Sequence, residues 1–241
     1  GAFSFFDDAF TYDKERAIKI CQEIRRRKIN VPWDAQTRVD RISPEVLDAM
    51  KAADCQLLSF GAESGCQKIL DSVHKKTTVE MNEKAIKMAK KAGLTVAMSV
   101  IIGFPGETKE SLKQTYDFIH RAEPDYVYLC MATPYPGTHL GSYLQELGWK
   151  VSDDWSKYDA TKVIVSPLNM TPEKLLERYD NIKNSIYGTL SILKRALPNI
   201  TLSYEQAVFY FALNYGYQSK NNPSHKSYIY RNPPDVPVDF N

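Results

Sequence analysis

Acidic side chains at two places in the first 70 residues have neighbours that suit ligand chemistry. Asp7 and Asp8 are adjacent carboxylates, which suit acid–base work or the binding of an ammonium group. Neighbours on an extended chain point in opposite directions, so we do not expect them to share one proton, and capping of the next turn is the alternative role. Glu63 lies in the segment Gly61–Gly65, whose glycines permit close backbone approach, and we expect it to contact a ligand.

An arginine and a glycine-rich turn add groups that suit a charged or flat ligand. Arg38 carries the forked donors that a carboxylate prefers, and an ion pair with Asp40 or Glu45 is the alternative interpretation. Residues 103–108, Gly-Phe-Pro-Gly-Glu-Thr, lack the lysine of a phosphate loop and the spacing of a dinucleotide fingerprint. Their glycines still let backbone groups approach a ring or a phosphate, and we interpret Glu107 as serving the next helix N-terminus.

These residues follow segments with the composition of β-strands, at 3–6, 31–36, 56–60, 94–102 and 126–131. Helical patterns separate the segments, and helix N-cap signals occur at residues 11–13, 43, 78 and 108. The helix that begins at residue 78 is expected to bury Met81, Ala85, Met88, Ala89 and Ala92, and the next one Leu112, Tyr116 and Ile119. The alternation predicts an α/β fold with about five parallel strands and crossover helices. Ligands bind at the carboxyl ends of such strands, which places the candidate residues along one edge.

The C-terminal third has a different pattern. Residues 149–171 are irregular, a long helix is predicted from Pro172 toward Leu197, and another is predicted from Ser203 to Tyr217. The tail, residues 218–241, carries four prolines and is expected to be extended. The sequence therefore predicts an α/β part followed by a C-terminal helical region.

Composition excludes several classes of protein. With 241 residues, 43% of them hydrophobic, and a net charge of only +2, the chain is not disordered and has no global attraction to nucleic acid or membranes. The longest apolar run, at 95–104, is about half of a helical membrane span. Four cysteines and four histidines are scattered without the spacing of metal ligands, so no metal site is expected: Cys21, Cys55, Cys66, Cys130, His74, His120, His139 and His225. So few cysteines indicate reduced thiols and a cytoplasmic protein.

Five segments in order resemble the radical S-adenosylmethionine (SAM) superfamily. They are Phe-Phe-Asp-Asp-Ala-Phe-Thr at 5–11, Thr-Arg-Val-Asp at 37–40, Phe-Gly-Ala-Glu-Ser-Gly at 60–65, Ile-Ile-Gly-Phe-Pro-Gly-Glu-Thr at 101–108 and Thr-Pro-Tyr-Pro-Gly-Thr at 133–138. The branch that the chain resembles most has an upstream cobalamin-binding domain and is typified by the anaerobic magnesium-protoporphyrin monomethyl ester oxidative cyclase. The resemblance implies an incomplete (β/α)6 barrel over 1–148, a helical extension over 149–217 and an extended tail over 218–241.

The resemblance also implies SAM-binding roles for individual residues. Asp7 and Asp8 match the segment that meets the SAM amino group. Glu63 matches a polar residue at the methionyl or ribose part of SAM, and Lys75 matches a basic residue that pairs with the SAM carboxylate.

Four further positions complete this set of expectations. Arg38 matches a polar side chain that a barrel strand presents to SAM, and Ser99 matches a ribose-contacting position that is often acidic elsewhere in the superfamily. Gly103, in the turn at 101–106, and Ala132 match backbone stretches that flank the adenine.

One feature of the superfamily is missing from the sequence. The Cys-x3-Cys-x2-Cys loop that holds a 4Fe-4S cluster does not occur here. We therefore expect the chain to be a fragment without the first barrel strand and the cluster loop, and to be inactive alone. The parent would use SAM, a 4Fe-4S cluster and cobalamin on an upstream domain to oxidise or methylate a small molecule. The missing strand would leave an open sheet edge that invites self-association.

Two alternatives remain open on the residues alone. A complete TIM-like hydrolase or lyase would use Asp7, Asp8 and Glu63 as acid–base groups, although five strands are too few for that barrel. A non-catalytic interaction module would use the aromatic-rich helix near residues 204–217 as its partner surface.

The residues do not identify the substrate. Tyr135, Trp149 and Trp155 either shape an aromatic pocket or pack at the lower rim of the barrel.

Overall fold

The computed structural model describes residues 1–146, 154–165, 169–196 and 214. The strands are β1 (Phe3–Phe5), β2 (Trp33–Thr37), β3 (Cys55–Glu63), β4 (Thr95–Ile102) and β5 (Tyr126–Met131). The helices are α1 (Lys14–Arg26), α2 (Pro44–Ala52), α3 (Gln67–Ser72), α4 (Val79–Lys91), α5 (Lys109–Ala122), α6 (His139–Glu146), α7 (Pro172–Tyr187) and α8 (Thr189–Ala196). Two short 3-10 turns are η1 (Val39–Arg41) and η2 (Trp155–Lys157). None of the helices in these ranges has both the length and the apolar composition of a membrane span.

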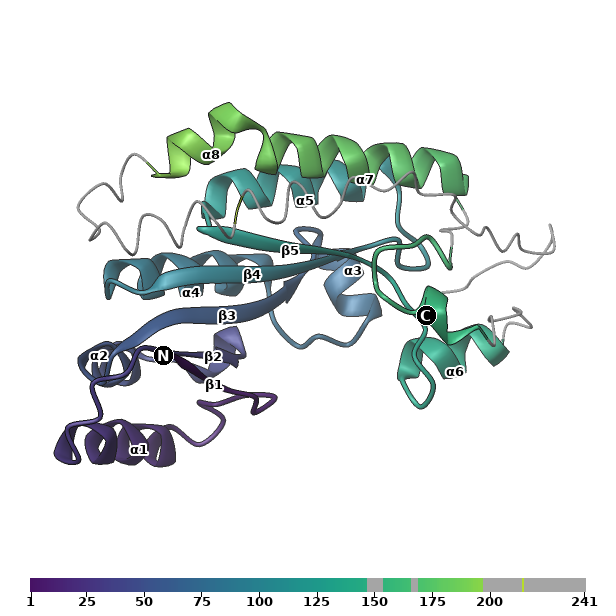
Figure 1. Ribbon diagram of the computed structural model, residues 1–241. Coiled ribbons are helices and arrows are strands. Elements are labelled where there is room, and N and C mark those ends of the chain that lie inside the picture. Colours follow the sequence, from purple (N-terminus) through teal and green to yellow (C-terminus); the bar gives the residue numbers. More distant parts are fainter. Residues whose placement is uncertain (147–153, 166–168, 197–213, 215–241) are drawn as a thin grey trace. The chain divides into compact units, whose positions relative to one another are not determined.

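The strands form one five-stranded sheet in the order β1-β2-β3-β4-β5 (Figure 1). The pairs β1–β2, β2–β3 and β3–β4 are parallel, and each connection between neighbouring strands contains a helix. This architecture confirms the α/β prediction. Within the described ranges β1 and β5 are the two edges of the sheet.

The chain divides into two compact units. The first unit comprises residues 1–70, 76–100 and 117–128, and the second comprises residues 71–75, 101–116 and 129–241. In the first unit Trp33 is 1% exposed, its indole N–H donates to the Ala53 carbonyl at 2.5 Å, and its ring meets Phe5 and Phe10. Burial of large aromatic rings of this kind contributes much of the free energy of folding.

Polar side chains begin the helices at the positions that the sequence predicts. Asp13, Ser43 and Thr78 accept hydrogen bonds from the backbone N–H three residues on, which satisfies an otherwise unpaired donor in the first turns of α1, α2 and α4. In the second unit Thr108 and Ser111 exchange bonds in the same way, with Ser111 N to Thr108 Oγ1 at 3.1 Å and Thr108 N to Ser111 Oγ at 2.9 Å.

Two helix faces differ from prediction. On α4 the buried residues are Asn82, Ala85, Ile86 and Ala89, whereas Met81 is 38% exposed. The buried face is thus turned by one residue toward Asn82, whose side chain bonds to the end of β3. On α5 Tyr116 is 36% exposed, and the buried Thr115 lies on the inner face instead.

The predicted long helix from residue 172 is interrupted at Gly188. There α7 ends, the backbone becomes extended (φ −61°, ψ 143°) and α8 begins at Thr189. A Cβ at Gly188 would lie 2.8 Å from the Asn184 carbonyl oxygen, so the residue must be glycine for this bend. Helix α6 was not predicted. The predicted helix at 203–217 and the tail at 218–241 lie outside the described residues, apart from Asn214.

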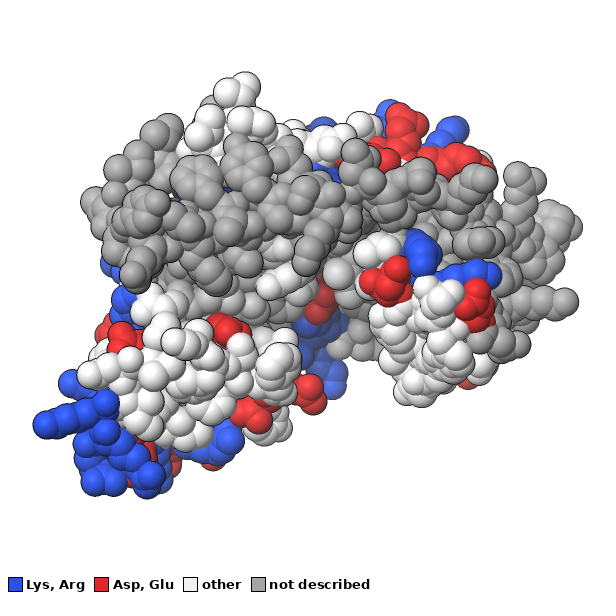
Figure 2. All heavy atoms as spheres, in the orientation of Figure 1, with Lys and Arg blue, Asp and Glu red and all other residues white. Residues whose placement is uncertain are grey.

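The basic run Arg25–Lys28 ends α1 as an exposed helix end. Lys and Arg side chains gather there in the first unit (Figure 2). Glu23 pairs with Arg26 and Arg27, with N–O distances of 2.6 Å for both. Basic side chains at this position interact favourably with the negative end of the helix dipole while their charged groups stay in water.

Candidate functional site

The register of the first unit brings several candidate residues to one level of the sheet. Thr37 at the end of β2 pairs with Phe60 of β3, and Gly61 pairs with Ser99 of β4. Arg38 directly follows Thr37. Since neighbouring strands lie about 5 Å apart, these positions form a continuous row across the sheet, in the carboxyl-terminal halves of β2, β3 and β4.

The acidic segment after β1 reaches the same level. Phe5 pairs with Ala35, and Phe10, which follows the two aspartates, donates its N–H to the Gln36 carbonyl at 3.0 Å. The chain is held there because the buried hydroxyls of Thr11 and Thr37 share a 2.5 Å hydrogen bond. Asp7 pairs with Arg16 at 3.6 Å, and both side chains are about half exposed, at 43% and 53%. Asp8 is exposed.

Arg38 is oriented by its own neighbour. Its Nε donates to Asp40 Oδ1 at 2.9 Å and its Nη2 donates to Asp40 Oδ2 at 3.1 Å, which is a bidentate pair. Partial burial raises the pKa of the Asp40 carboxyl, but the hydrogen bonds and charge of Arg38 outweigh that effect and leave the pKa lower than usual. The ion pair that the sequence offered as an alternative is therefore present, and it fixes the direction of the guanidinium.

A β-bulge positions Glu63. The register between β3 and β4 shifts between Gly61 and Glu63, and Glu63 has φ +64°, a left-handed conformation that is uncommon outside glycine. The bulge is anchored because the buried Asn82 donates from Nδ2 to the Ala62 carbonyl at 3.0 Å. Such a conformation persists only where its surroundings impose it, which is typical of functional sites. Sequence reasoning missed Asn82, although a lone amide on an apolar helix face was an available signal.

The second unit holds the glycine-rich turn. Gly103 has φ +93°, and a Cβ there would lie 2.9 Å from Leu175 Cδ2. Ala132 donates its N–H to the Ile102 carbonyl at 2.8 Å, and its Cβ would be 3.9 Å from a Cβ on Gly103. The structure therefore brings Gly103 and Ala132 into direct contact, and their implied role beside the adenine stays a prediction.

Glu107 holds this turn closed. It is fully buried, and its Oε2 accepts a hydrogen bond from the Gly103 N–H at 2.5 Å, while its own N–H donates to the Phe104 carbonyl at 3.0 Å. Its Oε1 has no hydrogen-bond partner in the described part of the chain. Burial raises the pKa of the Glu107 carboxyl to about 7. The glutamate thus ties the end of β4 to the start of α5, a closer contact than the helix-terminus role that we predicted.

Lys75 also belongs to the second unit. It is partly buried. The residues on either side of it, His74 (φ +52°) and Lys76 (φ +59°), both have left-handed backbone conformations. His74 meets His139 edge-on, with ring centroids 5.3 Å apart. The scattered histidines of the sequence are thus not all isolated.

The described residues do not suit an iron–sulfur cluster. Across the described ranges no three His, Cys, Asp or Glu side chains gather as metal ligands. Cys21, Cys55 and Cys66 are buried and Cys130 is partly exposed. Burial raises the pKa of the Cys21 thiol to about 11 and that of Cys55 further, which disfavours the thiolate that a cluster needs.

Comparison with known proteins relates this geometry to a family. The sequence profile of the Radical SAM superfamily matches residues 2–119. An uncharacterized methyltransferase of Pyrococcus horikoshii is 36% identical over 215 residues, which is 84% of this chain and 47% of that protein. The anaerobic magnesium-protoporphyrin IX monomethyl ester cyclase of Rubrivivax gelatinosus is 34% identical over 181 residues, 74% of this chain and 32% of that protein.

A solved structure shares the fold. The radical SAM methyltransferase TsrM of Kitasatospora setae, with cobalamin and a [4Fe-4S] cluster bound, matches 73% of this chain and 37% of its own chain with a TM-score of 0.52 and 19% identity. The present chain therefore spans about a third to a half of the length of the proteins it matches. The radical-SAM-type arrangement of strands and helices expected from the sequence is confirmed.

Proposed function

We propose that this chain, whose residues 2–119 belong to the radical SAM superfamily, supplies part of the SAM site and part of the substrate wall of a radical SAM oxidoreductase or methyltransferase. The strand register of the first unit supports the proposal, because Glu63 and Ser99 lie on neighbouring strands and Arg38 directly follows Thr37, the partner of Phe60. When bound, SAM supplies a methyl group or a 5′-deoxyadenosyl group. The substrate is a small molecule, as it is for the cyclase relative by its name.

The polar side chains near the carboxyl ends of these strands have hydrogen-bonding groups that complement the polar groups of SAM. The carboxylates of Asp8 and Glu63 accept hydrogen bonds from the ammonium group or the ribose hydroxyls, since ionised acceptors form the stronger hydrogen bonds. Asp7 already pairs with Arg16, so Asp8 is the better placed of the two aspartates for the amino group. Ser99 offers a neutral hydroxyl to the ribose at a position that is often acidic elsewhere in the superfamily.

The second unit offers groups of a different kind. Lys75 supplies a cation for the SAM carboxylate, and the backbone around Gly103 and Ala132 supplies a flat surface for the adenine. The buried Glu107 contributes by fixing the Gly103 N–H. Each of these roles is part of the proposal and is tested by ligand binding.

Cluster chemistry does not come from the described residues, because their cysteines are dispersed and mostly buried. We assign the 4Fe-4S ligands, and any cobalamin domain, to other parts of a longer protein, and we expect this chain alone to leave SAM uncleaved. Anaerobic reconstitution with iron and sulfide, followed by iron analysis and a SAM-cleavage assay, tests this. Stoichiometric iron together with SAM cleavage would overturn it.

Calorimetric titration with SAM tests the site itself. We expect saturable binding to the wild-type chain and binding about 10- to 100-fold weaker in Glu63→Gln, because a charge-assisted hydrogen bond contributes about 1.5–3 kcal/mol. Asp48→Asn is the matched control, since Asp48 is an exposed carboxylate on α2. Equal affinities for the wild type and Glu63→Gln would contradict the assignment of Glu63. An absence of SAM binding in the wild type would favour an interaction module instead.

A further inference from the structure

Three aromatic rings gather beside the end of β5 in the second unit. Tyr135 is 42% exposed and Trp155 is 65% exposed, although both are large apolar side chains. Each meets Tyr158, with ring centroids 5.9 Å apart for Tyr135 and 5.2 Å apart for Trp155. The rings are tilted against each other by 54° and 43°, so neither outer ring lies flat on Tyr158.

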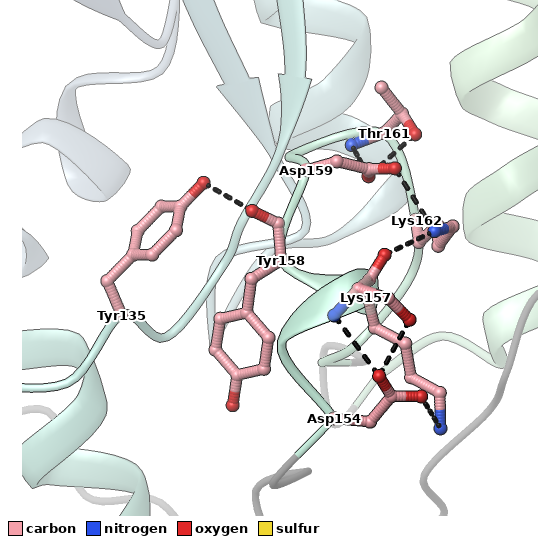
Figure 3. Close-up of polar contacts among 8 residues, drawn as sticks. Tyr135, Asp154, Lys157, Tyr158, Asp159, Thr161 and Lys162 are labelled. Carbon is pink, nitrogen blue, oxygen red and sulfur yellow. Dashed lines mark hydrogen bonds and ion pairs between the residues drawn. The ribbon is translucent and has the colours of Figure 1, made fainter.

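Tyr158 anchors this group to the fold. Its ring packs against the buried cluster of Leu144, Ile164 and Val165, which joins α6 to the segment after η2. Tyr135 donates its hydroxyl hydrogen to the Tyr158 carbonyl at 3.0 Å (Figure 3). The polar end of Tyr135 is thereby satisfied, and its ring presents an apolar face.

The loop that carries Trp155 is held together by hydrogen bonds among its own residues. Asp154 Oδ1 accepts from the backbone N and Oγ of Ser156, and Asp159 Oδ1 accepts from the same groups of Thr161, so two similar turns follow each other (Figure 3). Lys162 donates to the Ser156 carbonyl at 2.7 Å and thereby links the two turns. Both are polar turns of the kind in which a short side chain bonds the backbone two residues on.

The same loop is tied to the sheet and carries no net charge. The Met131 N–H at the end of β5 donates to the Ala160 carbonyl at 2.7 Å. Lys157 lies 3.4 Å from Asp154, and Lys162 lies 3.1 Å from Asp159, so each cation is matched by an acid. The exposed rings therefore lie in a loop whose charges are balanced and whose backbone is hydrogen-bonded to the end of β5, and such pre-organisation lowers the entropic cost of binding a ligand.

We propose that Tyr135 and Trp155, fixed by Tyr158, form a stacking platform for a planar conjugated ring of the substrate. Aromatic rings attract other π-systems in offset-stacked or edge-to-face arrangements, and the absence of net charge favours a ring over an ion. The position follows β5, on the carboxyl side of the sheet where α/β folds bind ligands. The inference rests on the proposed function for the identity of the ligand as substrate, but the platform can be tested without SAM.

Protoporphyrin IX is the probe, titrated into the full chain and followed by its absorbance shift and by calorimetry. We expect saturable binding to the wild type, binding about tenfold weaker in Trp155→Ala and in Tyr135→Ala, and an intermediate loss in Trp155→Phe, which keeps a ring. Leu190→Ala is the matched control, because Leu190 is an exposed apolar residue of α8 in the same unit (76% exposed), and it should bind as the wild type does. Circular dichroism checks that each variant is folded.

Several outcomes would overturn the platform. These are no binding of protoporphyrin IX, equal affinity in Trp155→Ala and the wild type, or equally tight binding of decanoate, a flexible chain without a ring. SAM titration of the same proteins separates the two proposals. If SAM fails to bind while protoporphyrin IX binds through Trp155, the proposed function fails and the ring platform stands.

Discussion

Neutralising the buried Glu107 should remove a pH dependence from the stability of the protein. Its carboxyl is fully buried and its pKa is raised from 4.5 to about 7 by burial. The native state then holds the proton more tightly than the unfolded chain does. The free energy of unfolding is therefore greatest below the unfolded pKa and falls as the pH rises from about 4.5 to about 7.

The size of the effect follows from the shift in pKa. Each pKa unit corresponds to about 1.4 kcal/mol, so the loss between about pH 5 and about pH 8 is on the order of 3 kcal/mol. Glu107→Gln keeps the shape and the acceptor for the Gly103 N–H but does not titrate. We expect this variant to match the wild type at the acid end and to be more stable by up to that amount at the alkaline end.

Urea unfolding followed by circular dichroism across this pH range measures the difference. Glu110→Gln is the control, because Glu110 is exposed in the first turn of α5, and its pH profile should follow that of the wild type. Parallel profiles for Glu107→Gln and the wild type would refute the reasoning. If the stability of Glu107→Gln falls more steeply with pH than that of the wild type, the effect of the Glu107 carboxyl on stability has the opposite sign to the one predicted.

Three further predictions concern the first unit and the thiols. Trp33→Phe loses the indole hydrogen bond of 2.5 Å and leaves a carbonyl unpaired, so urea unfolding should show a loss of about 1–3 kcal/mol, and an unchanged midpoint would contradict this. Asn82→Ala frees the β3 bulge and should weaken SAM binding as Glu63→Gln does, whereas Met81→Ala on the exposed side of the same helix should not. Iodoacetamide should label Cys130 before Cys21, because Cys21 is 1% exposed and burial raises the pKa of its thiol to about 11. Peptide mass spectrometry measures both labelling rates, and equal rates would argue against the buried position of Cys21.

The order of elements could be predicted from local sequence because the signals that define it are local. Alternating apolar runs gave five strands, and Asp13, Ser43, Thr78 and Thr108 marked helix starts where the structure has them. A capping side chain bonds a backbone group three residues away, so no distant contact is needed to recognise it.

Helix faces were predicted less well for the opposite reason. The periodicity of α4 allowed either Met81 or Asn82 to face inward, and both give a helical spacing with Ala85 and Ala89. The carbonyl of Ala62, twenty positions earlier in the chain, accepts the hydrogen bond that makes burial of the amide favourable. The choice was made by the tertiary structure.

The sequence by itself indicated the resemblance to the radical SAM superfamily, the order of strands and helices along the chain, and a set of candidate residues that follow the predicted strands. Only the tertiary structure decided the bulge that sets Glu63 at φ +64°, the bond from Gly103 to Glu107, and the separate contacts of Tyr135 and Trp155 with Tyr158. Motifs depend on residue type and spacing, which the chain carries in one dimension. Burial, backbone strain and ring contacts depend on which distant segments pack together, and no local pattern encodes that.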